Sequence, residues 1–120
     1  MIRLVTSDSY RKDIQRMIDD VSFAENSIIC MEECAELIKV VSKLFRSGFE
    51  DPEKRKGNRQ YQKLWEDLRE EMADVMIFID LLKRMYDISD IYLEDMIRHK
   101  MYRNIRRLEH GDENGETIGV

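Results

Sequence analysis

Segments in which apolar residues recur every three or four positions alternate with shorter segments that lack this spacing. Such recurrence places apolar side chains on one face of an α-helix. Each patterned segment follows a Ser, Asp or Asn that can cap a first helical turn, and no segment has the alternating pattern of a strand. The pattern predicts four main helices, over Tyr10 to Val21, Ser22 or Ser27 to Phe45, Asn58 to Asp87, and Ser89 to Leu108.

Residues 48–58 form the one sizeable break between these helices. They contain the only Pro of the chain, two of its five Gly, and the charged run from Glu53 to Lys56. Such a composition buries little surface and predicts a loop. We therefore expect an all-α fold, a bundle of four main helices in a single domain over residues 1–110, followed by a flexible acidic tail over residues 111–120.

Composition restricts the classes of function. A chain of 120 residues has the size of one domain, so an active site must lie within it or between copies of it. Twenty Lys and Arg against 25 Asp and Glu give a net charge of -5, which argues against binding of a nucleic-acid polymer. Apolar runs such as Val75 to Ile79 are far shorter than the ~20 residues of a membrane span. We expect a cytoplasmic protein with no membrane contact.

Two carboxylates of the second predicted helix lie on its apolar side. Successive residues of an α-helix are about 100° apart around the axis, which places Glu33 inside the apolar arc and Glu36 at its rim. Glu32 falls on the solvated flank, together with Lys39 and Lys43. The three glutamates of this segment are therefore not equivalent.

The third predicted helix repeats this arrangement, with Glu71 inside the apolar arc and Asp74 at its rim. An ionised carboxylate among apolar neighbours is unfavourable unless it is paired, hydrogen-bonded or bound to a metal. If the two apolar faces pack together, four carboxylates converge and repel one another. Oxygen ligands without His or Cys favour Mg²⁺ or Mn²⁺, and these ions point to phosphate chemistry. Ion pairs with Lys or Arg of neighbouring helices are the alternative interpretation.

Two strings carry these carboxylates: Glu32-Glu33-Cys34-Ala35-Glu36 and Glu70-Glu71-Met72-Ala73-Asp74. They resemble the EExxE and ExxD motifs of the MazG-like, all-α nucleoside triphosphate pyrophosphohydrolases. The resemblance covers about residues 22 to 108. The spacer between Glu36 and Glu71 departs from it, because this spacer is long compared with that of the compact members.

The resemblance implies an Mg²⁺-dependent enzyme that cleaves the bond between the α and β phosphates and releases a nucleoside monophosphate and pyrophosphate. Such an enzyme removes unwanted nucleotides from the pool. By motif position, Glu33, Glu36, Glu71 and Asp74 would be the metal ligands. Glu32 would support the site or help to position the attacking water.

Two alternatives stay open. The first is a pyrophosphohydrolase specific for dUTP, dCTP or phosphoribosyl-ATP, with the same site and a different substrate. The second is a non-catalytic helical oligomerisation module with a vestigial acidic cluster, for which wide apolar faces suffice. The apolar arcs exceed what one four-helix unit needs to cover, so we expect a homo-oligomer, a dimer or a tetramer.

Basic residues provide candidates for substrate binding. Lys100, Asn104 and Arg107 form one stripe along the fourth helix, suited to phosphate oxygens and to a base or sugar. Lys54, Arg55, Lys56 and Arg59, in and after the break at 48–58, are candidates for a flexible lid over a triphosphate. Ordinary solvated surface charge is the alternative for both groups.

Overall fold

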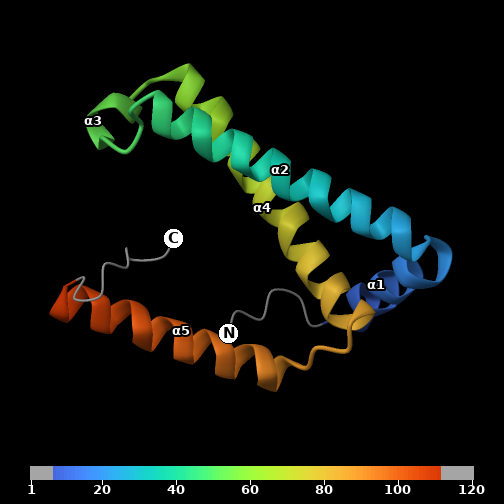
Figure 1. The fold of residues 1–120 in the computed structure, drawn as a ribbon. Coiled ribbons are helices and arrows are strands. Elements are labelled where there is room, and N and C mark those ends of the chain that lie inside the picture. Colours follow the sequence, from blue (N-terminus) through green and yellow to red (C-terminus); the bar gives the residue numbers. More distant parts are fainter. Residues whose placement is uncertain (1–6, 112–120) are drawn as a thin grey trace. The chain divides into compact units, whose positions relative to one another are not determined.

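The computed structural model describes residues 7–111, in which every regular element is a helix (Figure 1). The predicted all-α fold is confirmed, and no strand occurs between residues 7 and 111. The predicted acidic tail, apart from Gly111, lies outside the described residues. The helices are α1 (Asp8–Asp20), α2 (Phe23–Arg46), α3 (Pro52–Arg55), α4 (Arg59–Met85) and α5 (Asp90–His110).

The four long helices begin after residues that are among the N-cap candidates of the sequence. In each case a side-chain oxygen accepts a hydrogen bond from the backbone N–H three residues later, which satisfies a donor that the helix cannot pair itself. Ser22 caps α2 in this way, whereas Ser27 lies inside the helix and its hydroxyl donates to the carbonyl of Phe23 at 2.8 Å. The capping residues are Ser7, Ser22, Asn58 and Ser89.

The break between α2 and α4 is more ordered than a plain loop, although most of residues 48–58 are exposed, as predicted. It contains the short helix α3, which has Asp51 as N-cap and a Pro in its first turn. It also buries Phe49, whose ring packs edge-on against Tyr61 at a centroid distance of 5.3 Å. The Arg55 guanidinium donates to the Phe49 carbonyl and lies 5.6 Å from the Tyr61 ring centroid. One aromatic side chain therefore anchors this segment to α4.

The described residues form two units, one containing α1 to α4 and the other containing α5. In the first unit, α2 and α4 run antiparallel and side by side, and α1 also packs on α4 (Figure 1). Ile14 of α1 joins Phe78 and Leu81 of α4 in a buried apolar cluster. A hydrogen bond of 2.6 Å from the Tyr10 hydroxyl to Asp80 lies beside this cluster. Burial and this bond raise the Tyr10 pKa to about 12.

Among the described residues, the second unit contains the helix α5. Its helix begins after Ser89 and ends at Gly111, whose positive φ of 71° suits a residue without a Cβ. No helix between residues 7 and 111 is long and apolar enough to cross a membrane.

Candidate functional site

Three of the predicted carboxylates meet between α2 and α4. Glu33 of α2 and Glu71 and Asp74 of α4 each offer one oxygen, and these oxygens lie within 4.8 Å of one another. All three side chains are half-buried. We call Glu33, Glu71 and Asp74 the carboxylate cluster. Its geometry agrees with the sequence pattern, because Glu33 and Glu71 each lie within the apolar arc of their helix and the two helices pack against each other.

One oxygen of this cluster has no partner. Glu71 Oε2 is shielded from solvent and accepts no hydrogen bond from the described residues. A buried carboxylate oxygen without a donor is unfavourable, and binding of a proton or a cation removes this penalty. Glu71 is therefore the residue of the cluster at which a proton or a cation has the largest effect.

The pKa values of Glu33 and Glu71 are raised because both carboxylates are partly buried and lie near other negative charges. Burial raises the pKa of Glu71, and the negative charges of Asp74 and Glu36 raise it further. Burial is also the largest cause of the raised pKa of Glu33, followed by the charge and hydrogen bond of Asp74. Desolvation and like charge both disfavour the ionised form. In the absence of a cation, the chain thus holds these side chains in an environment that favours protons.

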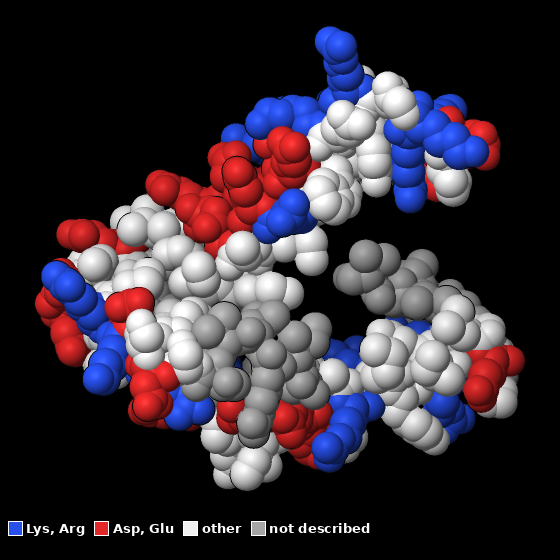
Figure 2. Space-filling view, turned by 180° about the vertical axis from the view of Figure 1, so that it is seen from behind, with Lys and Arg blue, Asp and Glu red and all other residues white. Residues whose placement is uncertain are grey.

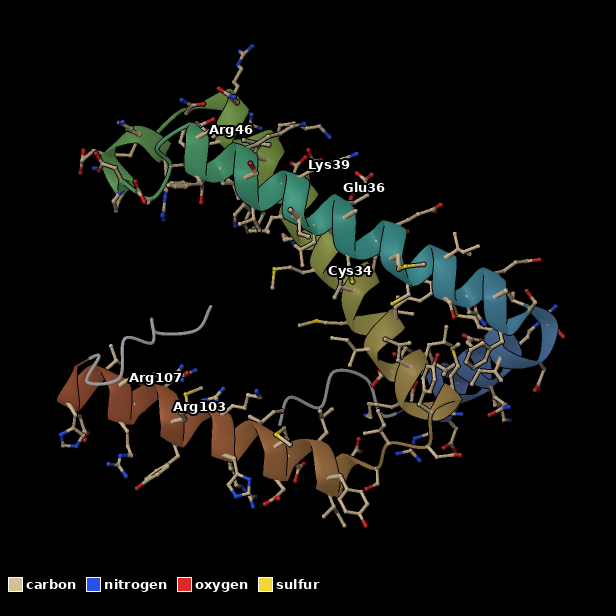
Figure 3. All side chains as sticks on the ribbon, viewed as in Figure 1. Cys34, Glu36, Lys39, Arg46, Arg103 and Arg107 are labelled. Carbon is tan, nitrogen blue, oxygen red and sulfur yellow. The ribbon has the colours of Figure 1, made fainter. Side chains whose placement is uncertain are left out.

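Glu36 lies beside the cluster and outside it. Its side chain is exposed and forms an ion pair with Lys39, with an O···N distance of 3.2 Å. Figure 3 labels both residues on α2. The charge of Glu36 still raises the pKa of Glu33 and Glu71. An exposed pair of this kind contributes about 0 to 1 kcal/mol, so it holds Glu36 only weakly. Glu32 is exposed, as its position on the solvated flank predicts.

The predicted basic residues lie elsewhere in the chain. Lys54 belongs to α3, and its Nζ lies against the turn at Gly48, where a Cβ would approach it to 2.8 Å. Arg59 is exposed at the first position of α4. On α5, Lys100 is exposed, whereas Asn104 and Arg107 are half-buried. Figure 3 labels Arg107 near the end of this helix. Their contact with substrate stays a prediction.

Three basic residues that were not predicted as site residues line a polar pocket between α2 and α4. These are Lys43, Arg46 and Lys63, around a cavity of about 630 Å³. Considered one helix at a time, each is an ordinary residue of a solvated flank. The pocket can be recognised only when the two helices are placed antiparallel, because the flank of α2 that carries Glu36 then adjoins the flank of α4 that carries Asp74.

Comparisons of the chain with models of protein families, with curated proteins and with solved structures find no match. The donor set of the carboxylate cluster is therefore the main guide to its chemistry. It consists of oxygen atoms only, which suits a hard divalent cation such as Mg²⁺ or Mn²⁺ better than Zn²⁺. A shielded, unpartnered oxygen at Glu71 fits such an ion.

We expect Glu71→Gln to stabilise the metal-free protein, and to do so increasingly as the pH rises above the unfolded-state Glu pKa of about 4.3. A pKa raised by folding means that the folded protein binds more protons than the unfolded chain above this pH. Stability from Glu71 is therefore lost as the pH rises through its folded pKa. Urea unfolding in chelator, compared between variant and parent across this pH range, measures the effect.

Glu66→Gln is the matched control for this experiment, since Glu66 is an exposed residue of the same helix. It should leave the pH dependence close to that of the parent. A Glu71→Gln variant whose stability differs from the parent by the same amount at every pH would contradict the expectation.

Proposed function

We propose that the chain is a Mg²⁺-dependent nucleoside triphosphate pyrophosphohydrolase of the MazG-like type. The observation that carries the proposal is the carboxylate cluster, in which oxygens from two antiparallel helices lie within 4.8 Å and one of them is shielded without a partner. The positions of Glu33, Glu71 and Asp74 in the two acidic motifs support it further. Surface carboxylates that serve only solubility have no reason to converge on an apolar helix interface.

Glu33, Glu71 and Asp74 are the residues that would hold Mg²⁺, with Glu36 as the neighbouring fourth candidate. When bound, the ion supplies charge stabilisation at phosphate oxygens and lowers the pKa of a water. The chain's own contribution is to fix these carboxylates on two rigid helices and to shield Glu71 from bulk water. Exposed Glu32, one residue before Glu33, is the candidate to position the attacking water.

The substrate is proposed to be a nucleoside triphosphate cleaved between the α and β phosphates, with release of a monophosphate and pyrophosphate. Water is the nucleophile in this proposal, because the sequence pattern places no Ser, Cys or His beside a base that could activate it. A dUTP, dCTP or phosphoribosyl-ATP pyrophosphohydrolase uses the same carboxylates. The base and sugar specificity distinguishes these enzymes from one another.

A homo-oligomer is also part of the proposal. One edge of the α2 and α4 pair exposes large apolar side chains, an arrangement that favours burial against a further protein surface. A non-catalytic oligomerisation module is the second candidate function, because this same observation suffices for it. The exposed side chains on this edge are Ile38, Val41, Phe45, Trp65, Met72 and Ile79.

Hydrolysis of a nucleotide panel with Mg²⁺ in ¹⁸O-labelled water tests the proposed reaction. We expect a monophosphate and pyrophosphate in equal amounts, with one label in the monophosphate, since attack at the α phosphorus places the water oxygen there. Mass spectrometry of both products measures the label. Orthophosphate as the first product from a triphosphate would contradict the assignment. Failure to hydrolyse any nucleotide would leave the oligomerisation module as the function.

A further inference from the structure

The polar pocket between α2 and α4 combines three basic side chains from two helices. Lys43 and Arg46 come from the last turn of α2, and Lys63 comes from the first half of α4. Asp67 is the one carboxylate among the lining residues. The remaining lining residues are Ser47, Gln60 and Leu64.

The positive charge of this pocket is only partly compensated. Lys63 pairs with Asp67 at 2.9 Å, which neutralises one cation. Arg46 donates to the carbonyl of Ser42 at 3.4 Å, and across residues 7–111 no carboxylate pairs with Lys43 or Arg46. Cations are generally favoured in the last turn of a helix, which accounts for Lys43 and Arg46. It does not account for Lys63, which reaches the same pocket from the other helix.

The pocket adjoins the carboxylate cluster on one edge of the helix pair. Lys43 follows Glu36 by two turns of α2, about 10 Å along the axis, and lies about 20° from it around the axis. Lys63 precedes Glu71 by about 12 Å along α4. Asp67 links the two sites, since it lines the pocket and its negative charge contributes to the raised pKa of Glu71 one turn later.

Acidic and basic side chains are accordingly separated along this edge. Figure 2 shows a band of Asp and Glu side chains over the α2 and α4 pair, with Lys and Arg side chains bordering it on the side toward α3. A phosphate chain has one part that shares a metal with carboxylates and another part that requires direct positive charge. This edge of the helix pair offers carboxylates that can share a metal and, next to them along the helices, direct positive charge.

We propose that Lys43, Arg46 and Lys63 bind the terminal phosphates of a polyphosphate ligand whose inner phosphate lies at the carboxylate cluster. The orientation of the ligand rests on the proposed function, whereas the binding of a phosphate chain does not. Long flexible Lys and Arg side chains can reach along the helix pair toward the cluster. For a hydrolase, the pocket holds the pyrophosphate leaving group and stabilises the charge that develops on it.

Calorimetric titration of the full chain with inorganic tripolyphosphate in Mg²⁺ tests the pocket directly. We expect Lys43→Gln and Lys63→Gln each to weaken binding about tenfold, the effect of losing one charge-assisted hydrogen bond. The same variants should raise KM for a nucleoside triphosphate more than they lower kcat. Lys12→Gln, an exposed lysine of α1 in the same unit, is the matched control.

The outcomes separate this proposal from the proposed function. Weaker tripolyphosphate binding in Lys43→Gln and Lys63→Gln, without hydrolysis of any nucleotide, supports the pocket and contradicts the enzyme. If both variants hydrolyse the nucleotide with unchanged KM and bind tripolyphosphate with unchanged affinity, the proposed role of the pocket is overturned. The proposed enzymatic activity then still stands. If a single-stranded oligonucleotide without a terminal phosphate chain binds as tightly as tripolyphosphate, the proposed pocket ligand is also overturned. The ligand is then a nucleic-acid backbone. Circular dichroism of each variant confirms that the helices are intact.

Discussion

Glu71→Gln is expected to lower nucleotide hydrolysis by about 10³-fold, the scale of removing one essential electrostatic group from an active site. The amide keeps the shape of the side chain and removes its negative charge. Glu71 contributes the shielded Oε2 and lies with Glu33 and Asp74 in the cluster. Glu33→Gln should have an effect of similar size, since it removes the α2 contribution to the cluster. Initial rates of pyrophosphate release at saturating Mg²⁺ measure both.

The melting temperature provides the second readout for these variants. Mg²⁺ should raise the melting temperature of the parent, because a ligand that binds the folded site alone stabilises the folded state. The rise should vanish in Glu71→Gln, although the metal-free variant is itself more stable than the parent. Glu66→Gln should retain both the activity and the Mg²⁺ effect. Full activity of Glu71→Gln, or of the parent in chelator, would exclude the carboxylate cluster as the metal site.

Glu32→Gln should affect turnover more than Mg²⁺ affinity, in contrast to Glu33→Gln. The two residues are neighbours in the chain, but Glu32 is exposed on the flank and Glu33 is half-buried in the cluster. Isothermal titration with Mg²⁺ and initial-rate measurements, run on both variants, separate the two roles. Equal loss of Mg²⁺ affinity in the two variants would show that the position around the helix does not determine the role.

The features that depend on local sequence were predictable. Helix spacing and N-cap residues act within a few positions, so the sequence limits each helix start to a few candidate caps without knowledge of the tertiary structure. Ser7, Ser22, Asn58 and Ser89 are the candidates that cap the helices. The convergence of Glu33 and Glu71 was predictable for a related reason. A carboxylate within an apolar arc lies near the neighbouring helix when the part of the arc that contains it packs there.

The features that depend on side-chain conformation or on a second helix were not predictable. Glu36 was expected among the ligands, but its position at the rim lets it turn outward to Lys39. The burial of Phe49 follows from its contact with Tyr61 across the break, which no local pattern encodes. The pocket at Lys43 and Lys63 appears only after α2 and α4 are paired antiparallel. Each of these features requires knowledge of which elements are neighbours in space.

Leu81→Ala is expected to lower the free energy of unfolding by about 2 to 5 kcal/mol, the range observed when a buried leucine leaves a cavity. Leu81 is fully buried, and it joins Phe78 and Ile14 in the cluster that attaches α1 to α4. Leu81→Met is the matched control, because it conserves volume and should cost less than about 1.5 kcal/mol. Urea unfolding followed by circular dichroism measures both variants, and a cost below about 1 kcal/mol for Leu81→Ala would contradict the packing of α1 on α4. Leu81 lies two turns beyond Asp74 on α4, so the activity of each folded molecule at low temperature should equal that of the parent.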